Sequence, residues 1–168
     1  MDYKIKYSKR RTTALKIVSG ELHVIAPVGQ PLSVTEKLIE KHINWIRKSI
    51  EKSREKALRF PPLEDEEIKK MKKEARRYFL DKTEYYAKMM GLSYGRITIT
   101  SAEKRFGSCS QKKNLCFSYR LMRYPERARE YVIVHELSHL VFMNHSKKFY
   151  EHIEKFMPDY KERSRLLK

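Results

Sequence analysis

The stretch that most constrains this chain runs from Tyr131 to His139 and reads Y-V-I-V-H-E-L-S-H. On a helix, His135 and His139 lie one turn apart on one face, so both imidazoles can bind the same cation. The apolar residues Tyr131–Val134 precede the H-E-x-x-H string, and Leu140–Met143 follow it, which predicts a buried helix. Because unpaired imidazoles and a carboxylate are costly in such a helix, the pattern favours a zinc ion, which binds neutral imidazole nitrogens.

A third ligand is expected from His145, six residues beyond the string. A helix that ends near Met143 would turn the chain back past its own site and bring this histidine to the other two. Three histidines leave a fourth coordination position open for water, as in catalytic zinc sites. The alternative is a set of core histidines bonded to backbone carbonyls. The sequence therefore predicts one Zn²⁺ per chain, held by His135, His139 and His145, with Glu136 as the general base.

The length of 168 residues and the hydrophobic content of 40% fit one well-packed domain, with or without a smaller appendage. No apolar run reaches the length of a membrane span, and the start at Met1 has no apolar stretch like that of a signal peptide. We therefore expect a cytoplasmic location and no membrane partner. Cys109 and Cys116 fit reduced thiols there, with a disulfide or metal pair as the alternative.

The formal net charge of +17 is large for a chain of this size. Such a field attracts nucleic acid, nucleotides or acidic protein segments. The alternative is a lysine-rich, solvated surface without a specific partner. Nucleic acid or a nucleotide is therefore a possible partner, beside a peptide or protein substrate.

Residues 1–62 are predicted to form a β meander followed by a helix. Strand-like runs alternate with lysines, and Ser19-Gly20 between two of them is a hairpin signal. One helical stripe begins at the capping-box sequence Ser33–Glu36 and ends at Phe60–Pro62.

Residues 63–168 are predicted to form the metal-binding region. A long helix leads to strands at Ile97–Thr100 and Leu115–Tyr119, and either strand could receive a substrate backbone by strand addition. The metal-binding helix is expected to start at Pro125. We expect the two regions to pack together as one compact unit.

Matches to a known family run in order along nearly the whole chain. They are Ser8–Arg11, Ala26-Pro27, Trp45-Ile46, Gly91-Leu92, Tyr94-Gly95, Arg105, Gly107–Ser110, Asn114-Leu115, Arg120-Leu121, Pro125, Tyr131-Val132, His135–Leu137, His139, Asn144–Ser146 and Phe149. With these residues the chain resembles the YgjP-like, SprT-related zinc metallopeptidases. Phe106 stands where that family commonly has tryptophan, and Ser118-Tyr119 where it commonly has Asn-Trp.

The resemblance implies a zincin-like α+β fold, with small antiparallel β sheets packed on the H-E-x-x-H helix. It implies the same three zinc ligands, and a zinc-activated water that attacks a peptide carbonyl while Glu136 accepts the proton. A further donor to the oxyanion is expected. The candidates are Arg105, Tyr119, Arg120 and His152.

Two other classes of function stay open. Zinc-activated water also attacks phosphorus, which makes a nucleotide or phosphoanhydride hydrolase the first alternative. The second is a nucleic-acid-associated protein in which zinc only holds the fold. The residues that contact the substrate are not predicted.

Overall fold

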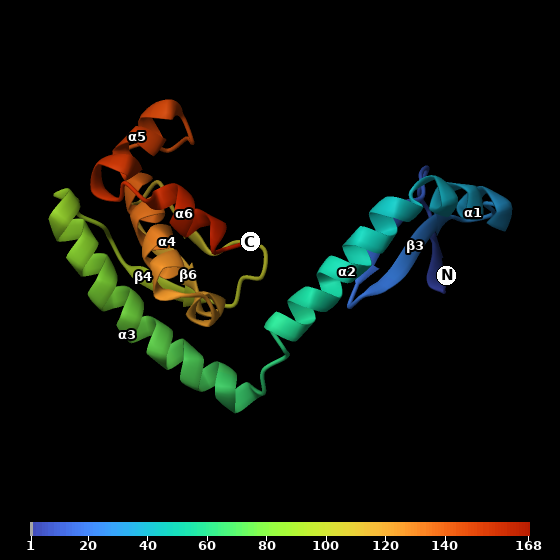
Figure 1. Ribbon diagram of the computed structural model, residues 1–168, viewed down its shortest axis with the longest axis horizontal. Coiled ribbons are helices and arrows are strands. Elements are labelled where there is room, and N and C mark those ends of the chain that lie inside the picture. Colours follow the sequence, from blue (N-terminus) through green and yellow to red (C-terminus); the bar gives the residue numbers. More distant parts are fainter. Residues whose placement is uncertain (1) are drawn as a thin grey trace. The chain divides into compact units, whose positions relative to one another are not determined.

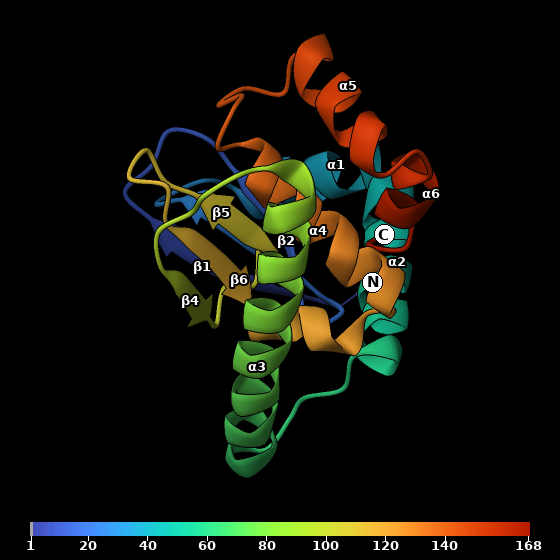
Figure 2. The same cartoon turned by 90° about the vertical axis from the view of Figure 1, so that its left-hand side faces the viewer.

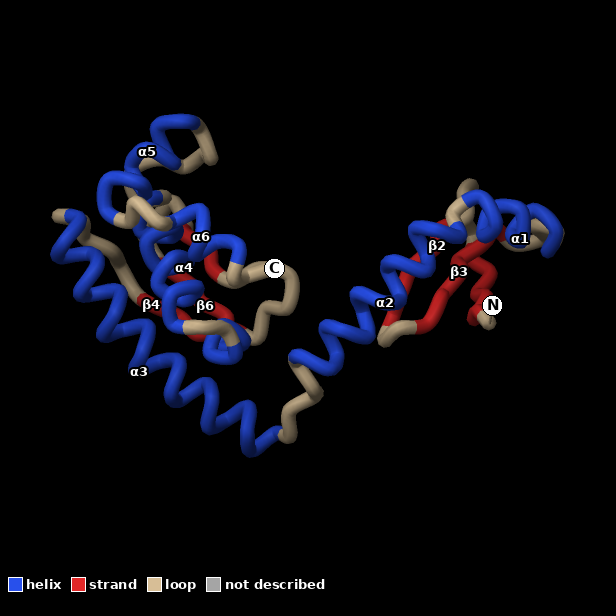
Figure 3. Tube along the Cα trace, viewed as in Figure 1, coloured by secondary structure: helices blue, strands red, loops and turns tan. Residues whose placement is uncertain are grey.

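The computed structural model describes residues 2–168 of the chain (Figure 1). They divide between Pro62 and Leu63 into two compact units, called unit 1 (residues 2–62) and unit 2 (residues 63–168). A short loop joins the last helix of unit 1 to the first helix of unit 2 (Figure 3). That the two regions pack as one body stays a prediction.

Unit 1 is a three-stranded sheet with two helices. Its strands are β1 (Tyr3–Ser8), β2 (Ala14–Val18) and β3 (Glu21–Pro27), and its helices are α1 (Leu32–Lys41) and α2 (Ile43–Arg59). Along β3 alternate side chains are buried, so this strand turns one face to the core. The core consists of Leu22, Val24, Ile39 and Ile46.

Unit 2, residues 63–168, contains a three-stranded sheet and five helices. Its strands are β4 (Ile97–Thr100), β5 (Gly107–Cys109) and β6 (Leu115–Ser118). The helices are α3 (Asp65–Met90), α4 (Glu126–Ser138), α5 (Lys147–Phe156), α6 (Tyr160–Arg165) and the 3₁₀ helix η1 (Tyr119–Arg123), and the loop 139–146 joins α4 to α5.

The long helix α3 and the motif helix α4 pack against each other and against the small sheet of unit 2 (Figure 2). Phe79 of α3 stacks on Phe117 of β6, with ring centroids 4.7 Å apart. From α4, Val132, Ile133 and Leu137 join the same core. The H-E-x-x-H segment is therefore anchored by its apolar neighbours, which fixes the direction of its polar side chains.

The α+β fold class is confirmed, whereas the expectations of antiparallel sheets and of a meander are wrong in detail. The strand order is β1-β3-β2 in unit 1 and β4-β6-β5 in unit 2. Strand β3 is parallel to β1 and antiparallel to β2, and strand β6 is parallel to β4 and antiparallel to β5. The hairpin turn is local, with positive φ angles at Ser19 and Gly20 in unit 1, but the parallel pairing is long-range and leaves no local signal.

The helix predicted from Ser33 to Phe60 is two helices, because the chain breaks at His42 between α1 and α2. The capping box is also wrong, since α1 begins at Leu32 after Pro31 without a side-chain cap. No helix within residues 2–168 is both long enough and apolar enough to cross a membrane.

Candidate metal centre

Helix α4 begins after Pro125, as predicted, and carries most of the H-E-x-x-H string. It ends at Ser138, so the predicted end near Met143 is wrong. The cause is a tighter turn, in which the N–H groups of Leu140 and Val141 bond the carbonyls three residues back. His139 still has helical φ and ψ angles, so its side chain keeps the same face as His135.

The structure brings His135, His139 and His145 together. One imidazole nitrogen of each lies within 4.8 Å of those of the other two. The Nε2 atoms of His135 and His145 are 3.1 Å apart. Two nitrogens held about 2.0 to 2.1 Å from a tetrahedral zinc ion stand about 3.3 Å apart, so the spacing fits such an ion. His145 is exposed, which leaves this side of the cluster open.

Hydrogen bonds orient the two helical imidazoles. The Nδ1 atom of His139 lies 3.0 Å from the carbonyl oxygen of Phe142, which directs its Nε2 atom away from the helix turn. The Nδ1 atom of His135 lies 3.4 Å from the hydroxyl of Tyr131. Phe149 packs on all three imidazole rings at centroid distances of 4.5 to 4.9 Å.

Burial keeps these imidazoles neutral. It lowers the pKa of His135 to about 3, with smaller contributions from His139 and His145. It also lowers the pKa of His139. Metal ions bind the deprotonated imidazole, so His135 and His139 are in the state that a metal requires near neutral pH.

The carboxyl of Glu136, the residue that follows His135, is buried, with 5% of the residue exposed. Burial raises its pKa to about 8, against the opposing charge of Arg105. Strand β5 lies against this carboxyl, because a Cβ atom built on Gly107 would stand 2.6 Å from Glu136 Oε1. A glycine is therefore needed at this point of contact.

Of the four candidate oxyanion donors, Arg105 is the one whose charge acts on Glu136. Tyr119 is 1% exposed and belongs to the core. Arg120 pairs with Glu103 at 2.8 Å. His152 lies on α5, where its Nδ1 atom is 3.2 Å from the hydroxyl of Ser138. That hydroxyl donates to a backbone carbonyl of α4, so the contact of His152 joins α5 to α4.

The sheet of unit 2 restricts where a substrate backbone can pair. Leu115–Ser118 (β6) is the central strand, so both of its edges are occupied and the prediction that it receives substrate is wrong. Ile97–Thr100 (β4) and Gly107–Cys109 (β5) are edge strands. Of these two, β5 contacts α4.

Sequence reasoning missed the contacts that two residues, Tyr131 and Gly107, make with His135 and Glu136. The spacing of four residues between Tyr131 and His135 was a usable signal, because it places both side chains on one helix face. The contact of Gly107 with Glu136 had no such signal, since it joins segments that are far apart in the sequence.

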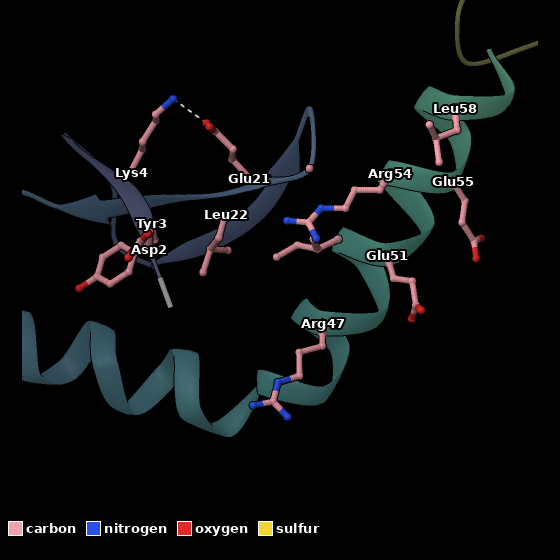
Figure 4. Close-up of a pocket in the computed structure, with 12 residues that line it drawn as sticks. Asp2, Tyr3, Lys4, Glu21, Leu22, Arg47, Glu51, Arg54, Glu55 and Leu58 are labelled. Carbon is pink, nitrogen blue, oxygen red and sulfur yellow. Dashed lines mark hydrogen bonds and ion pairs between the residues drawn. The ribbon is translucent and has the colours of Figure 1, made fainter. Parts of the chain in front are cut away.

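A separate hollow of about 800 Å³ lies in unit 1. Figure 4 shows Arg54 reaching toward the turn at Glu21, whereas Glu51 and Glu55 point away from the strands. Its lining mixes both signs of charge and includes none of the histidines. This hollow is therefore separate from the histidine cluster of unit 2.

Three converging imidazoles, with a buried glutamate between the two on the helix, are typical of metal-dependent hydrolases. The family model described as "YgjP-like, metallopeptidase domain" matches residues 63–168, and the chain belongs to this family. Unit 2 is thus a metallopeptidase domain.

One solved structure is similar to this chain, the metallopeptidase zymogen of Pyrococcus abyssi abylysin. The two share 21% sequence identity over 53% of this chain and 90% of that chain, with a TM-score of 0.49. No curated protein matches the chain.

Proposed function

We propose that unit 2 is a zinc-dependent peptidase, with His135, His139 and His145 as ligands of one Zn²⁺ and Glu136 as the general base. The observation that carries the proposal is the convergence of the three imidazoles, with the buried Glu136 lying between two of them in the sequence. Membership of a metallopeptidase family supports peptide bonds as the substrate class.

A bound zinc ion would supply a Lewis acid and lower the pKa of a water molecule. Glu136 would accept a proton from that water and later deliver it to the amine of the leaving peptide. Burial raises the pKa of Glu136, and the positive charge of a bound zinc ion would oppose this rise and favour the carboxylate form, which is the form that accepts a proton. Arg105 is our candidate for the donor that stabilises negative charge on the substrate.

We place the substrate backbone along the edge of β5. An extended peptide can add to a free strand edge through main-chain hydrogen bonds. Because β5 lies against Glu136 at Gly107, a peptide on this edge would pass the general base.

The experiment compares three proteins purified without added metal: the wild type, His145→Ala and Glu136→Gln. We expect about one zinc per wild-type chain, weaker binding in His145→Ala, and retained zinc without peptide hydrolysis in Glu136→Gln. His23→Ala, a histidine of unit 1 outside the cluster, is the matched control and should behave as wild type. A zinc content that does not respond to His145→Ala contradicts the proposal.

Two assays extend this test to the alternatives. A panel of nucleoside triphosphates beside the peptides distinguishes a peptidase from a nucleotide hydrolase, which the family match does not favour. Nucleic-acid binding has the net charge of +17 as its support, and it should fall steeply with salt if phosphates are contacted. The cytoplasmic location is also part of the proposal, and cell fractionation tests it.

A further inference from the structure

We propose that the hydroxyl of Tyr131 positions His135 as a metal ligand, by accepting a hydrogen bond from the Nδ1–H group of that imidazole. The inference rests on the proposed zinc site and adds to it a residue outside the H-E-x-x-H string. Tyr131 is a positioning residue, because it acts through His135 and does not touch the substrate.

The argument begins with which nitrogen of His135 faces the ion. Its Nε2 atom is the one directed at His145, 3.1 Å from the Nε2 atom of that ring. A neutral imidazole carries hydrogen on one nitrogen only, so ligation through Nε2 leaves the hydrogen on Nδ1. His135 is partly buried, so this N–H group is stabilised by an acceptor within the protein.

The hydroxyl oxygen of Tyr131 is the polar atom within reach of this nitrogen. The distance of 3.4 Å is at the long end for a hydrogen bond. Tyr131 precedes His135 by four residues, and helical side chains lean toward the N-terminus, so the imidazole lies over the turn that carries the phenol. The two ring centroids are 5.7 Å apart.

His139, the second proposed ligand on the helix, has its hydrogen-bond partner on the C-terminal side of the motif. Its Nδ1 atom lies 3.0 Å from the carbonyl oxygen of Phe142, in the turn that follows α4. The two ligands of one helix thus have different partners, a phenol before the motif for His135 and a backbone carbonyl after it for His139. Such partners fix the tautomer and the orientation of a ligating imidazole.

Tyr131→Phe tests the inference, because it removes one oxygen atom and keeps the ring. We expect zinc affinity, measured by competition with a chelator, to fall about 10-fold. In the zinc-loaded variant, the NMR signal of the His135 Nδ1–H proton should be lost to exchange with water. The corresponding signal of His139 should persist, since its acceptor is backbone, and it reports in the same sample that the site is folded.

Tyr160→Phe is the matched control. Tyr160 is buried to 9% exposure, and within residues 2–168 its hydroxyl bonds to none of the three histidines. This variant should keep wild-type zinc affinity and both Nδ1–H signals.

The outcomes separate this inference from the proposed function. If the wild type binds zinc and Tyr131→Phe binds it equally well, the role of Tyr131 is wrong and the zinc site stands. Weaker binding with the His135 signal intact also overturns the role, because the loss then does not pass through this bond. If the wild type binds no zinc at His135, His139 and His145, the proposed site fails and the inference fails with it.

Discussion

The two units contain sheets of the same topology, in which the strand that comes last in the sequence lies in the middle of the sheet. They differ in what is buried on those sheets. Among residues 2–168, the core cluster of unit 1 has four buried apolar residues, whereas that of unit 2 has seventeen. Helices α3 and α4 supply most of the difference.

The difference explains why the polar chemistry lies in unit 2. A buried carboxyl such as that of Glu136 costs free energy, and a large apolar core can offset that cost. In unit 1 the buried polar side chain of Thr35 is instead satisfied, by a hydrogen bond of 2.9 Å from Gln30. The two units have the same strand topology, so the topology alone does not explain why the buried carboxyl lies in unit 2.

The largest effect is expected from Leu22→Ala in the core of unit 1. Leu22 is fully buried, and such a truncation costs about 2 to 5 kcal/mol. A core of this size rarely supplies more than about 3 to 5 kcal/mol, so unit 1 should unfold while unit 2 keeps its fold and its zinc. Hydrogen exchange measured separately for residues 2–62 and 63–168 checks this.

The control for this prediction is Val18→Ala, in the same sheet. Val18 is 46% exposed, so its truncation should change stability by less than about 0.5 kcal/mol. Equal loss of hydrogen-exchange protection in both units after Leu22→Ala would show that they unfold together. This result would contradict the expectation that the two cores have separate stabilities.

The convergence of the three histidines was predictable from the sequence because its geometry is local. His135 and His139 share a helix face, and His145 follows only six residues later in the sequence. The fold class was implied by the family resemblance, whereas hydrophobic periodicity indicated individual helices and strands. The short strand β5 was not predicted, since Gly107–Cys109 has no alternating pattern and pairs only because β6 lies beside it. Strand order failed for the same reason, as it depends on contacts between distant segments.

Gly107→Ala tests the contact in unit 2 between its sheet and the carboxyl of Glu136, the proposed general base. The added Cβ atom would stand 2.6 Å from Glu136 Oε1, so the carboxyl must move. Displacement of a catalytic group by about 1 Å can cost about 100-fold in rate, and we expect a loss of this size in kcat with unchanged zinc affinity. Steady-state peptide hydrolysis and chelator competition measure the two quantities.

Gly95→Ala is the matched control for Gly107→Ala. Its Cβ atom would also meet a side chain, that of Asn114, which bonds the N–H group of Arg96 at 3.0 Å. We expect lower stability with normal kcat. If Gly107→Ala keeps full activity, the contact does not position the general base.

Acid should weaken unit 2 through an ion-pair network that crosses α3, α4 and α6. Glu130, with 14% of its side chain exposed, contacts Lys82 at 2.9 Å and Arg163 at 2.7 Å. Burial acts to raise the pKa of Glu130, but the hydrogen bonds from these two cations prevail and lower it below 4.5. The folded state therefore binds fewer protons than the unfolded state, and stability is lost as the pH falls below 4.5 through the lowered pKa.

Glu130→Gln should reduce this acid dependence and destabilise unit 2 by about 1 to 2 kcal/mol at neutral pH, between the values for exposed and buried pairs. Urea unfolding between neutral and acid pH measures both. Glu84→Gln is the control, because Glu84 pairs with Lys88 in solvent, and there we expect no measurable change. An acid dependence that survives Glu130→Gln would place its origin elsewhere.

The smallest effects are expected at the two cysteines, which lie in unit 2 and report on it alone. Cys109 pairs with Leu115, and Cys116 with Ser108, so adjacent positions of the ladder direct the two thiols to opposite faces of the sheet. Oxidation of the folded protein should therefore form no bond between them, which intact mass checks.

Alkylation sharpens the same point. Burial raises the pKa of the Cys109 thiol, and the charge of Glu136 raises it further. Above the Glu136 pKa of about 8, Glu136→Gln should therefore increase the thiolate fraction of Cys109 and speed its alkylation a few-fold, with Cys116 as the internal control. Leu22→Ala should leave both rates as in the wild type, because the unfolding of unit 1 exposes neither thiol. A faster reaction at both cysteines in Leu22→Ala would mean that unit 2 depends on unit 1 for its fold.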